Sequence, residues 1–362
     1  MKVLFIVTGI GYGDATREHA NIAAFKKKYP KSKILVAGYD NSYRYFKNKY
    51  KTIWIKGYKL PGKSLKINVL HFALRNLFLP AFWVLGTLKV RLEAFNFIPD
   101  IIVSDFEPVG ISLSKVLFRK CVVVFGFDPL LYKEYRKKHK VSYKMRVEAA
   151  YFTQLYAQAH FVIIPSFQAP KPQLEYAYVK PILRVMPQAL PSQQVLMKKL
   201  KLKRKPILIM LGGSNFGFKL VKHINKLAER IDEDFVVFGG KLDLEFPPNV
   251  EYIAYTDKFF SYLKVCKAVI TLGGQMTLAE ALVYKKPVLC FPIQGHIEQV
   301  LNAYSLRDVV CVSHRSSYKD VRKVLPRFLR NLSSWEKKVK KFNLQAGGQH
   351  QVVELIAAMG KK

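Results

Sequence analysis

Short apolar runs rich in β-branched residues, separated by helical patterns, constrain the fold of this chain most strongly. The runs lack a polar–apolar alternation, which is typical of parallel strands covered on both faces. The pattern therefore predicts an α/β protein with doubly wound parallel sheets. In the first half the runs are VLFIVT (3–8), KILVAG (33–38), TIWIKG (52–57), IIVSD (101–105), CVVVFG (121–126) and FVIIP (161–165). In the second half they are ILIMLGG (207–213), FVVFGG (235–240), VEYIAY (250–255), AVITLGG (268–274), VLCFP (288–292) and VVCVS (309–313).

The two series of strands predict two Rossmann-like domains. A chain of 362 residues exceeds the size at which one hydrophobic core keeps growing. We expect an N-terminal domain at 1–165 and a C-terminal domain at 205–340, joined by a linker at 166–204 with several prolines and the basic run MKKLKLKRK. A helical pattern runs over 335–359. We expect a C-terminal helix at 341–362 that packs back on the N-terminal domain.

The chain is strongly basic, with a formal net charge of +35. Residues 1–204 carry 36 Lys and Arg against 11 Asp and Glu, whereas 205–362 carry 24 against 14. A basic first half attracts anionic surfaces, either phospholipid headgroups or nucleic acid; a lysine bias of the whole proteome explains the charge equally well. The basic residues are dispersed and no nucleic-acid recognition motif is present, so nucleic acid is not an expected partner.

The stretch NLFLPAFWVLGTL (76–88) contains no charged residue. Thirteen residues with an internal proline are too few to cross a hydrocarbon core, which needs roughly 20. Two interpretations remain, a buried helix and a helix lying at a membrane surface, where the flanking Arg75, Lys89 and Arg91 would suit anionic lipid. The buried helix is the favoured expectation.

The four cysteines, Cys121, Cys266, Cys290 and Cys311, have no metal-ligand spacing. They are interpreted as small, buried, apolar side chains of a protein in a reducing compartment. Neither a disulfide framework nor a metal site is expected. The start MKVLFIVTG lacks the features of a secretion signal and is interpreted as the first core strand. We therefore expect a cytoplasmic protein without metal or cofactor.

Three glycine-rich turns follow strands, where open parallel sheets bind their ligands. The first, GIGYGDATREH (9–19), includes Gly11 and Gly13 and leads into a helix whose free N–H groups could face an anion or hydroxyl groups. The second, LGGSNFG (211–217), offers Gly213 and Ser214 as a phosphate nest. For both, a plain strand-to-helix turn is the alternative.

The third turn belongs to the segment VITLGGQMTLAEALVYKKPVLCFPIQGHIEQVLNA (269–303). A strand ends at Gly273 and Gly274, and a helix begins near Gln275, so its N-terminus and the Thr277 hydroxyl could bind a pyrophosphate. Glu280 lies nearly one turn later, where its carboxylate could accept two ribose hydroxyls; compensation of the helix dipole is the alternative. Residues 294–299 follow the next strand and supply amide and carboxylate groups suited to sugar hydroxyls.

This segment resembles the donor-sugar signature of the UDP-glycosyltransferase superfamily, which includes lipid-linked N-acetylglucosaminyltransferases of cell-wall synthesis and archaeal and bacterial relatives. LGGS after the linker and VSDFEP (103–108) also resemble that family, and the likeness covers nearly the whole chain. The matching residues of the segment are Gly273, Gly274, Thr277, Glu280, Pro287, Pro292, Glu298, Gln299, Asn302 and Ala303.

The resemblance implies a GT-B fold with an interdomain cleft and metal-independent hexosyl transfer from a nucleotide diphosphate. By the same likeness Gly273 to Thr277 would bind the phosphates, Glu280 the ribose, and Gln294, Glu298 and Gln299 the donor sugar. The uracil would stack near 255–259, beginning at Tyr255.

One position departs from the family pattern, because Asp14 stands where the first turn usually carries a histidine as general base. In related enzymes that histidine pairs with an aspartate at the end of a later strand, which Asp105 matches, so the two carboxylates are expected to face each other and share a proton. His19 lies too far along the helix to substitute. Three interpretations stay open: Asp14 is the base, the acceptor needs little activation, or activity has been lost. Glu107 is a further acceptor-side candidate, with a surface turn as its alternative.

The expected activity is inverting transfer of a sugar from a UDP-sugar to an acceptor hydroxyl. The basic, aromatic-rich first domain suggests a lipid-linked glycan as acceptor and peripheral attachment to the inner face of the cell membrane. The alternatives are a UDP-sugar 2-epimerase, and a protein that binds nucleotide-sugars or membranes without catalysis.

Overall fold

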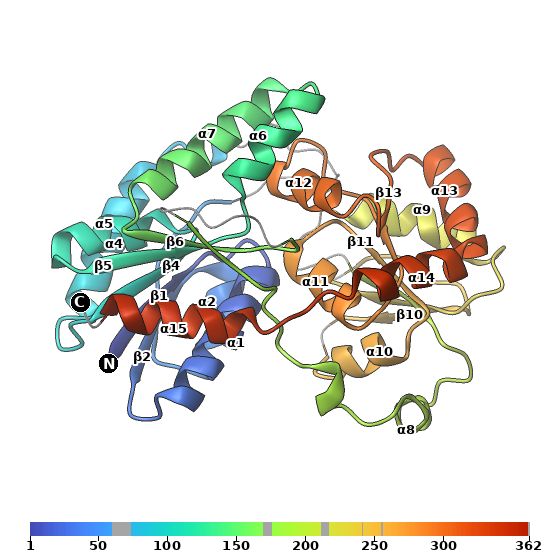
Figure 1. Cartoon of the computed structure of the whole chain (residues 1–362), viewed down its shortest axis with the longest axis horizontal. Helices are drawn as coiled ribbons and strands as arrows, with labels where there is room; N and C mark the ends of the chain where they lie inside the picture. Colours follow the sequence, from blue (N-terminus) through green and yellow to red (C-terminus); the bar gives the residue numbers. More distant parts are fainter. Residues whose placement is uncertain (60–73, 169–175, 211–216, 241, 255, 361–362) are drawn as a thin grey trace. The chain divides into compact units, whose positions relative to one another are not determined.

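The computed structural model describes all residues except 60–73, 169–175, 211–216, 241, 255 and 361–362 (Figure 1). The chain forms two compact units. Unit 1 contains the described residues of Met1–Pro61, Asn68–Arg184 and Ala346–Lys362, and unit 2 contains those of Val185–Gln345. No helix among the described residues has both the length and the apolar character needed to cross a membrane.

Unit 1 is built on a parallel sheet of seven strands in the order β3-β2-β1-β4-β5-β6-β7. Val3, Phe5 and Val7 of β1 point to one face and are fully buried against Phe25 of α1 and Ile356 of α15. The strands are β1 (Lys2–Val7), β2 (Lys33–Gly38), β3 (Thr52–Trp54), β4 (Ile101–Asp105), β5 (Lys120–Val124), β6 (Phe161–Pro165) and β7 (Tyr176–Val179).

Helices cover both faces of this sheet. Helix α15 lies against α1 on the face lined by Val3, Phe5 and Val7, as Figure 1 shows. Helices α4 and α5 pack against each other, and α5 also contacts β1 and β4. The helices of unit 1 are α1 (Tyr12–Lys28), α2 (Asp40–Phe46), α4 (Leu79–Glu93), α5 (Pro108–Leu117), α6 (Pro129–Lys138), α7 (Tyr143–Ala157) and α15 (Gly348–Gly360).

Unit 2 is built on a parallel sheet of six strands in the order β10-β9-β8-β11-β12-β13. Its strands are β8 (Ile207–Met210), β9 (Phe235–Phe238), β10 (Val250–Ile253), β11 (Ala268–Thr271), β12 (Val288–Cys290) and β13 (Cys311–Val312). Its helices are α8 (Gln193–Lys199), α9 (Phe218–Ala228), α10 (Phe259–Val265), α11 (Gln275–Val283), α12 (Ile297–Ser305), α13 (Tyr318–Arg330) and α14 (Leu332–Phe342), with a 3₁₀ turn at Pro187–Ala189.

The order of strands fixes where ligands can bind in each unit. In unit 1 the chain runs outward from β1 to β3 and then restarts at β4 on the other side of β1. In unit 2 it runs from β8 to β10 and restarts at β11 beside β8. In open α/β sheets the ligand crevice lies at the carboxyl ends of the strands beside such a reversal. The turns after β1, β4, β8 and β11 are therefore the places to examine.

Helix α1 begins at Tyr12, directly after Gly11, so Asp14 lies in its first turn. Two local expectations differ from the structure. The range 166–204 contains strand β7 and helix α8, where a linker was expected. The helical pattern over 335–359 is two helices, α14 and α15, because Asn343 and Gly347 take left-handed backbone angles between them. Asn343 is the C-cap of α14, and asparagine is one of the few residues besides glycine that adopt such angles, which ends the helix there.

Candidate active site

The turn after β1 in unit 1 is shaped by close backbone packing. Gly9 lies so near Tyr39 that a Cβ there would stand 1.9 Å from the Tyr39 carbonyl oxygen. The backbone N–H of Thr8 donates to the carbonyl of Asp105 at 3.3 Å, which joins the ends of β1 and β4. Gly11 is the N-cap of α1 in extended conformation, and no atom lies within 4 Å of a Cβ placed at Gly13. The turn thus exposes the first turn of α1 at the crevice of unit 1.

Arg17 organises the charged groups at this crevice. Its Nη2 donates to Oδ1 of Asp105 at 2.5 Å and to Oδ1 of Asp14 at 2.8 Å, and its Nε donates to Oδ2 of Asp105 at 3.2 Å. Arg17 and Asp105 are buried, whereas the Asp14 side chain is 23% exposed. A single guanidinium thus holds both aspartates, with a fork geometry that lysine could not provide.

The structure differs from the expectation that Asp14 and Asp105 face each other directly and share a proton. The two carboxylates contact the same nitrogen of Arg17, so a cation stands where a proton was expected. Sequence reasoning missed Arg17, although its spacing of three residues from Asp14 on one helix is a signal for an ion pair.

Glu18 adds a third carboxyl group to the cluster. Asn21 Nδ2 donates to both Glu18 oxygens at 3.2 Å, and Arg17 Nε lies 3.9 Å from one of them. Burial raises the pKa of Glu18 to about 7, while Arg17 and Asn21 favour its charged form. The pKa of Arg17 also rises, because the neighbouring carboxylates outweigh the opposing effect of its burial. Arg17 is consequently the permanent cation of the cluster.

His19 takes no part in this cluster. Its Nδ1 lies 2.8 Å from the Tyr45 hydroxyl, and its ring meets those of Tyr45, Phe46 and Tyr50 edge-on. Burial lowers the pKa of His19, and Lys49 and Arg184 lower it further. The histidine is thus packed among aromatic rings and lies apart from the cluster.

Glu107 is fully buried, so the alternative of a surface turn is wrong. It is the N-cap of α5, and Ser104 Oγ accepts its backbone N–H and donates to its carbonyl. Among the described residues neither carboxylate oxygen has a hydrogen bond of ordinary geometry. Burial raises the pKa of Glu107 to about 8, although the nearby N–H groups of Val109 and Trp83 oppose the rise. At neutral pH the side chain is thus a neutral acid.

Glu107→Gln should make the folding stability less dependent on pH. The carboxyl binds its proton more tightly in the folded state, so stability falls as pH rises from the ordinary value near 4.5 to about 8. Glutamine cannot ionise, so the variant should gain about 2 to 3 kcal/mol on wild type between pH 5 and pH 7 in urea unfolding. Glu93→Gln, an exposed change in α4, is the control, and an equal effect there would contradict the assignment.

In unit 2 the helix after β11 opens on two glycines. Gly273 has φ +95°, and a Cβ there would lie 3.2 Å from Cys290 Sγ. Gly274 is the N-cap of α11 at φ −62°, no side chain caps the helix, and no atom lies within 4 Å of a Cβ placed there. The α11 N-terminus therefore lies at the crevice of unit 2 with space beside it, which is the arrangement that binds phosphate groups.

Side chains from α12 hold this turn in place. Asn302 Nδ2 donates to the carbonyl of Gly273 at 3.1 Å, and Gln299 Oε1 accepts the N–H of Ile293 at 3.1 Å. Gln299 was expected at the donor sugar, and the structure gives its carbonyl oxygen this loop contact. Gln294 is exposed and donates to the carbonyl of His314 at 2.8 Å, while Glu298 is half-buried in the first turn of α12.

The remaining donor candidates lie on α11 or outside the described residues. Thr277 is half-buried, whereas Gln275 and Glu280 are buried, Glu280 with 1% of its surface exposed. Gly213, Ser214 and Tyr255 fall within residues that the structure does not describe. The described residues contain no cluster of three or more His, Cys, Asp or Glu able to hold a metal ion. The four cysteines are free thiols.

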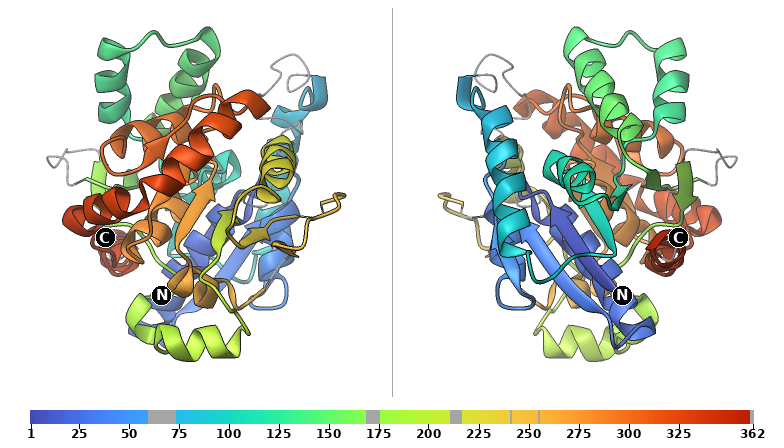
Figure 2. Two further views of the ribbon diagram at one scale, coloured as in Figure 1. Left: turned by 90° about the vertical axis from the view of Figure 1, so that its right-hand side faces the viewer. Right: turned by 90° about the vertical axis from the view of Figure 1, so that its left-hand side faces the viewer.

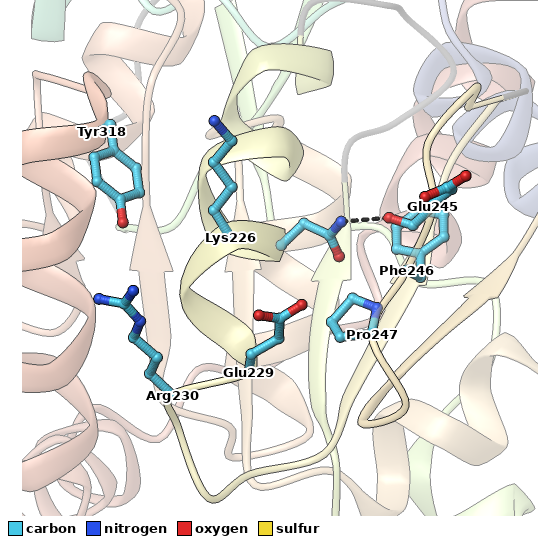
Figure 3. Close-up of a pocket in the computed structure, with 8 residues that line it drawn as sticks. Lys226, Glu229, Arg230, Glu245, Phe246, Pro247 and Tyr318 are labelled. Atoms are coloured by element: carbon cyan, nitrogen blue, oxygen red, sulfur yellow. Dashed lines mark hydrogen bonds between the residues drawn. The ribbon is translucent and has the colours of Figure 1, made fainter.

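A surface pocket of about 470 Å³ in unit 2 lies away from these turns (Figure 3). It lies between the last turns of α9, the segment before β10, and Tyr318 of α13. Asn225 donates to the carbonyl of Glu245 across it at 2.6 Å. Because α9 follows β8, its last turns lie at the end of the sheet opposite the carboxyl ends of the strands. The pocket contains none of the residues expected to bind the donor.

Comparison with known proteins assigns the family. The family model described as "Glycosyl transferase family 1" matches residues 1–333. The chain belongs to this glycosyltransferase family. An uncharacterized glycosyltransferase of Methanosarcina acetivorans is 23% identical over 333 residues, covering 84% of this chain and 82% of the relative. One from Methanosarcina mazei is 23% identical over 241 residues, covering 61% of each chain, so the match spans under two thirds of that relative.

Solved glycosyltransferases share the fold of this family member. A UDP-glucosyltransferase from Polygonum tinctorium, described as capable of glucosylating indoxyl and 3,4-dichloroaniline, superposes with a TM-score of 0.68 at 12% identity, covering 100% of this chain and 98% of the other. Arabidopsis thaliana UGT89C1, solved in complex with UDP, gives 0.64 at 13% identity and 99% of both chains. The expected α/β GT-B fold and the family are thus confirmed.

Proposed function

We propose that this glycosyltransferase moves a hexosyl group from a UDP-sugar to an acceptor hydroxyl, with inversion at the anomeric carbon and without a metal ion. The observation that carries the proposal is the α11 N-terminus. It begins at Gly274 with no side-chain cap and with open space beside it, at the reversal between β8 and β11. Backbone N–H groups in this arrangement favour a diphosphate and stabilise it as it leaves.

The other donor contacts follow from the same placement. Gly273 to Thr277 would hold the diphosphate, with Gln275 in the first turn of α11, and Glu280 would accept the ribose hydroxyls. Gln294, Glu298 and Gln299 would meet the donor sugar. Gly213, Ser214 and Tyr255 would complete the nucleotide site. UDP in the complex of Arabidopsis thaliana UGT89C1, a protein of the same fold, supports UDP as the leaving group.

The acceptor would bind at the crevice of unit 1, along the turn that contains Gly11 and Gly13. Its hydroxyl oxygen forms the new bond to the anomeric carbon, and the bond from that carbon to the diphosphate oxygen breaks. The electron pair of the broken bond leaves on the diphosphate. The hydroxyl proton passes to Asp14, the partly exposed member of the cluster, which Arg17 holds through Oδ1. Asp105 would position Arg17 and touch no substrate.

A lipid-linked glycan at the cytoplasmic face of a membrane would suit the basic first half of the chain. The test of the reaction is incubation with a panel of radiolabelled UDP-sugars and a lipid extract. Transfer of label into lipid with release of UDP supports the proposal. Isomerisation of the sugar without an acceptor would indicate an epimerase, and binding without either reaction would indicate a non-catalytic protein.

Gly274→Asp should remove UDP binding while leaving the fold intact. The glycine has φ −62° and open space, so a side chain fits there at little cost in stability, but its carboxylate would repel the diphosphate. We expect UDP affinity measured by calorimetry to fall about a hundredfold, the equivalent of roughly 2.7 kcal/mol. Gly13→Asp, an equally open position in unit 1, should leave UDP affinity unchanged. Unchanged affinity in Gly274→Asp would exclude α11 as the diphosphate site.

A further inference from the structure

Helix α4 of unit 1 exposes an apolar surface. Six large apolar side chains at its start, along it and just after its end are between 50% and 76% exposed. They are Phe78, Val84, Leu85, Leu88, Leu92 and Phe95, and we call them the α4 surface. A contiguous group of this kind on a monomer usually marks an interaction site, whereas scattered single residues do not. Figure 2 shows α4 running along the outside of its unit.

The α4 surface follows from the helical period of the sequence. Leu85, Leu88, Leu92 and Phe95 recur at spacings of three and four residues and therefore lie on one side of the helix. The opposite side holds the buried Leu79, Gly86, Thr87 and Val90. The expectation of a buried helix at 76–88 is wrong for this reason, since only that narrow stripe packs on the unit. Gly86 permits the close approach, because a Cβ there would lie 3.2 Å from Val109.

Basic side chains lie beside the α4 surface. Lys56 Nζ lies 3.6 Å from the centre of the Phe82 ring, and Lys89 Nζ lies 5.0 Å from that of Trp54, itself 45% exposed. Arg75 and Arg91 are exposed at the start of the surface and on α4. Glu93 is the single acidic residue between 74 and 98. The chain therefore combines an apolar stripe with a positively charged rim.

We propose that the α4 surface docks on an anionic lipid bilayer, with α4 lying in the plane of the membrane interface. An apolar helix face flanked by lysine and arginine matches the acyl boundary and the negative headgroups together. A second copy of the chain fits less well, because a two-fold contact would place the basic rim of one copy near the basic rim of the other. With 15 residues α4 is about 22 Å long, too short to cross a hydrocarbon core of about 30 Å. Docking is independent of sugar transfer, since no residue of the surface belongs to the candidate site.

The test measures flotation of the full chain with vesicles. We expect binding to vesicles of phosphatidylcholine with 30% phosphatidylglycerol, and weak binding to phosphatidylcholine alone. Leu88→Gln with Leu92→Gln should lower the partition coefficient about tenfold or more, because the polar side chains no longer enter the acyl boundary. Val147→Gln with Val195→Gln, two similarly exposed positions on α7 and α8, should bind like wild type. Arg91→Glu should weaken binding to the anionic vesicles only.

Several results would overturn the proposal. One is the absence of binding to anionic vesicles in low salt, and another is equal binding by the Leu88/Leu92 variant and the control. A third is a wild-type dimer in sedimentation equilibrium that dissociates in the Leu88/Leu92 variant, together with unaltered flotation. That pattern would make the α4 surface a contact between copies. Flotation and sedimentation equilibrium measure binding and association, so both can be interpreted even if the protein is inactive as an enzyme.

Discussion

Asp14→Asn is expected to lower kcat by about 10²- to 10⁴-fold, the range for loss of a general base. Asparagine keeps the size of the side chain and its first-turn position in α1, but its amide cannot take the acceptor proton. We expect UDP affinity to stay unchanged in calorimetry, because Asp14 belongs to unit 1 and the proposed diphosphate site to unit 2. The measurement is UDP release under saturating donor and acceptor.

The control for this variant is Asp40→Asn. Asp40 is also an aspartate in the first turn of a helix that follows a strand in unit 1, and its φ of 42° is one that asparagine accepts. Its activity should match wild type. A fully active Asp14→Asn would show that the acceptor needs no base from this residue. An inactive wild type that still binds UDP would show that this chain has lost catalysis.

Arg17→Met should destabilise the protein by about 3 to 5 kcal/mol. The variant leaves Asp105 fully buried without its cation, which is the costly way to break a buried ion pair. Methionine fills much of the same volume, so the loss reflects charge and hydrogen bonds more than a cavity. Urea unfolding at pH 7 measures the effect. Combining Arg17→Met with Asp105→Asn should recover part of the stability, because the uncompensated charge is then gone.

Unit 2 provides a matched control for the buried pair. Arg204 also binds two aspartates, Asp232 at 2.6 Å and Asp234 at 2.7 Å, but it lies at the surface. Solvent and salt screen that cluster, so Arg204→Met should change stability much less. Equal losses in Arg17→Met and Arg204→Met would show that burial of the Asp105 carboxylate is not the cause.

The elements of the sheets could be predicted because their signals are local. Continuous apolar runs such as VLFIVT and AVITLGG favour strands covered on both faces, and β1 and β11 lie there. The two glycines before α11 likewise indicated from the sequence alone that a helix begins there. Strand β7 was missed because YAYV (176–179) is half-exposed and follows a proline-rich stretch, so it lacks the apolar run of the others.

The burial of side chains and their ion-pair partners could not be predicted in the same way, because both depend on segments that are distant in sequence. Arg17 and Asp105 are 88 residues apart, and the reversal between β1 and β4 brings them together. Glu107 is buried in the folded unit, whereas the local sequence DFEP indicated only a turn. The apolar 76–88 segment shows the opposite case: its composition suggested burial, but only one stripe of α4 found a surface to pack on.

The sequence by itself determined the two parallel-sheet units, the helix start at Gly274 and the glycosyltransferase likeness, because periodicity and glycine positions act over a few residues. The tertiary structure alone decided that a guanidinium holds Asp14 and Asp105, that Glu107 is a buried acid, and that α4 faces outward. The physical reason is that charge pairing and solvent exposure depend on which distant segments the strand order brings together.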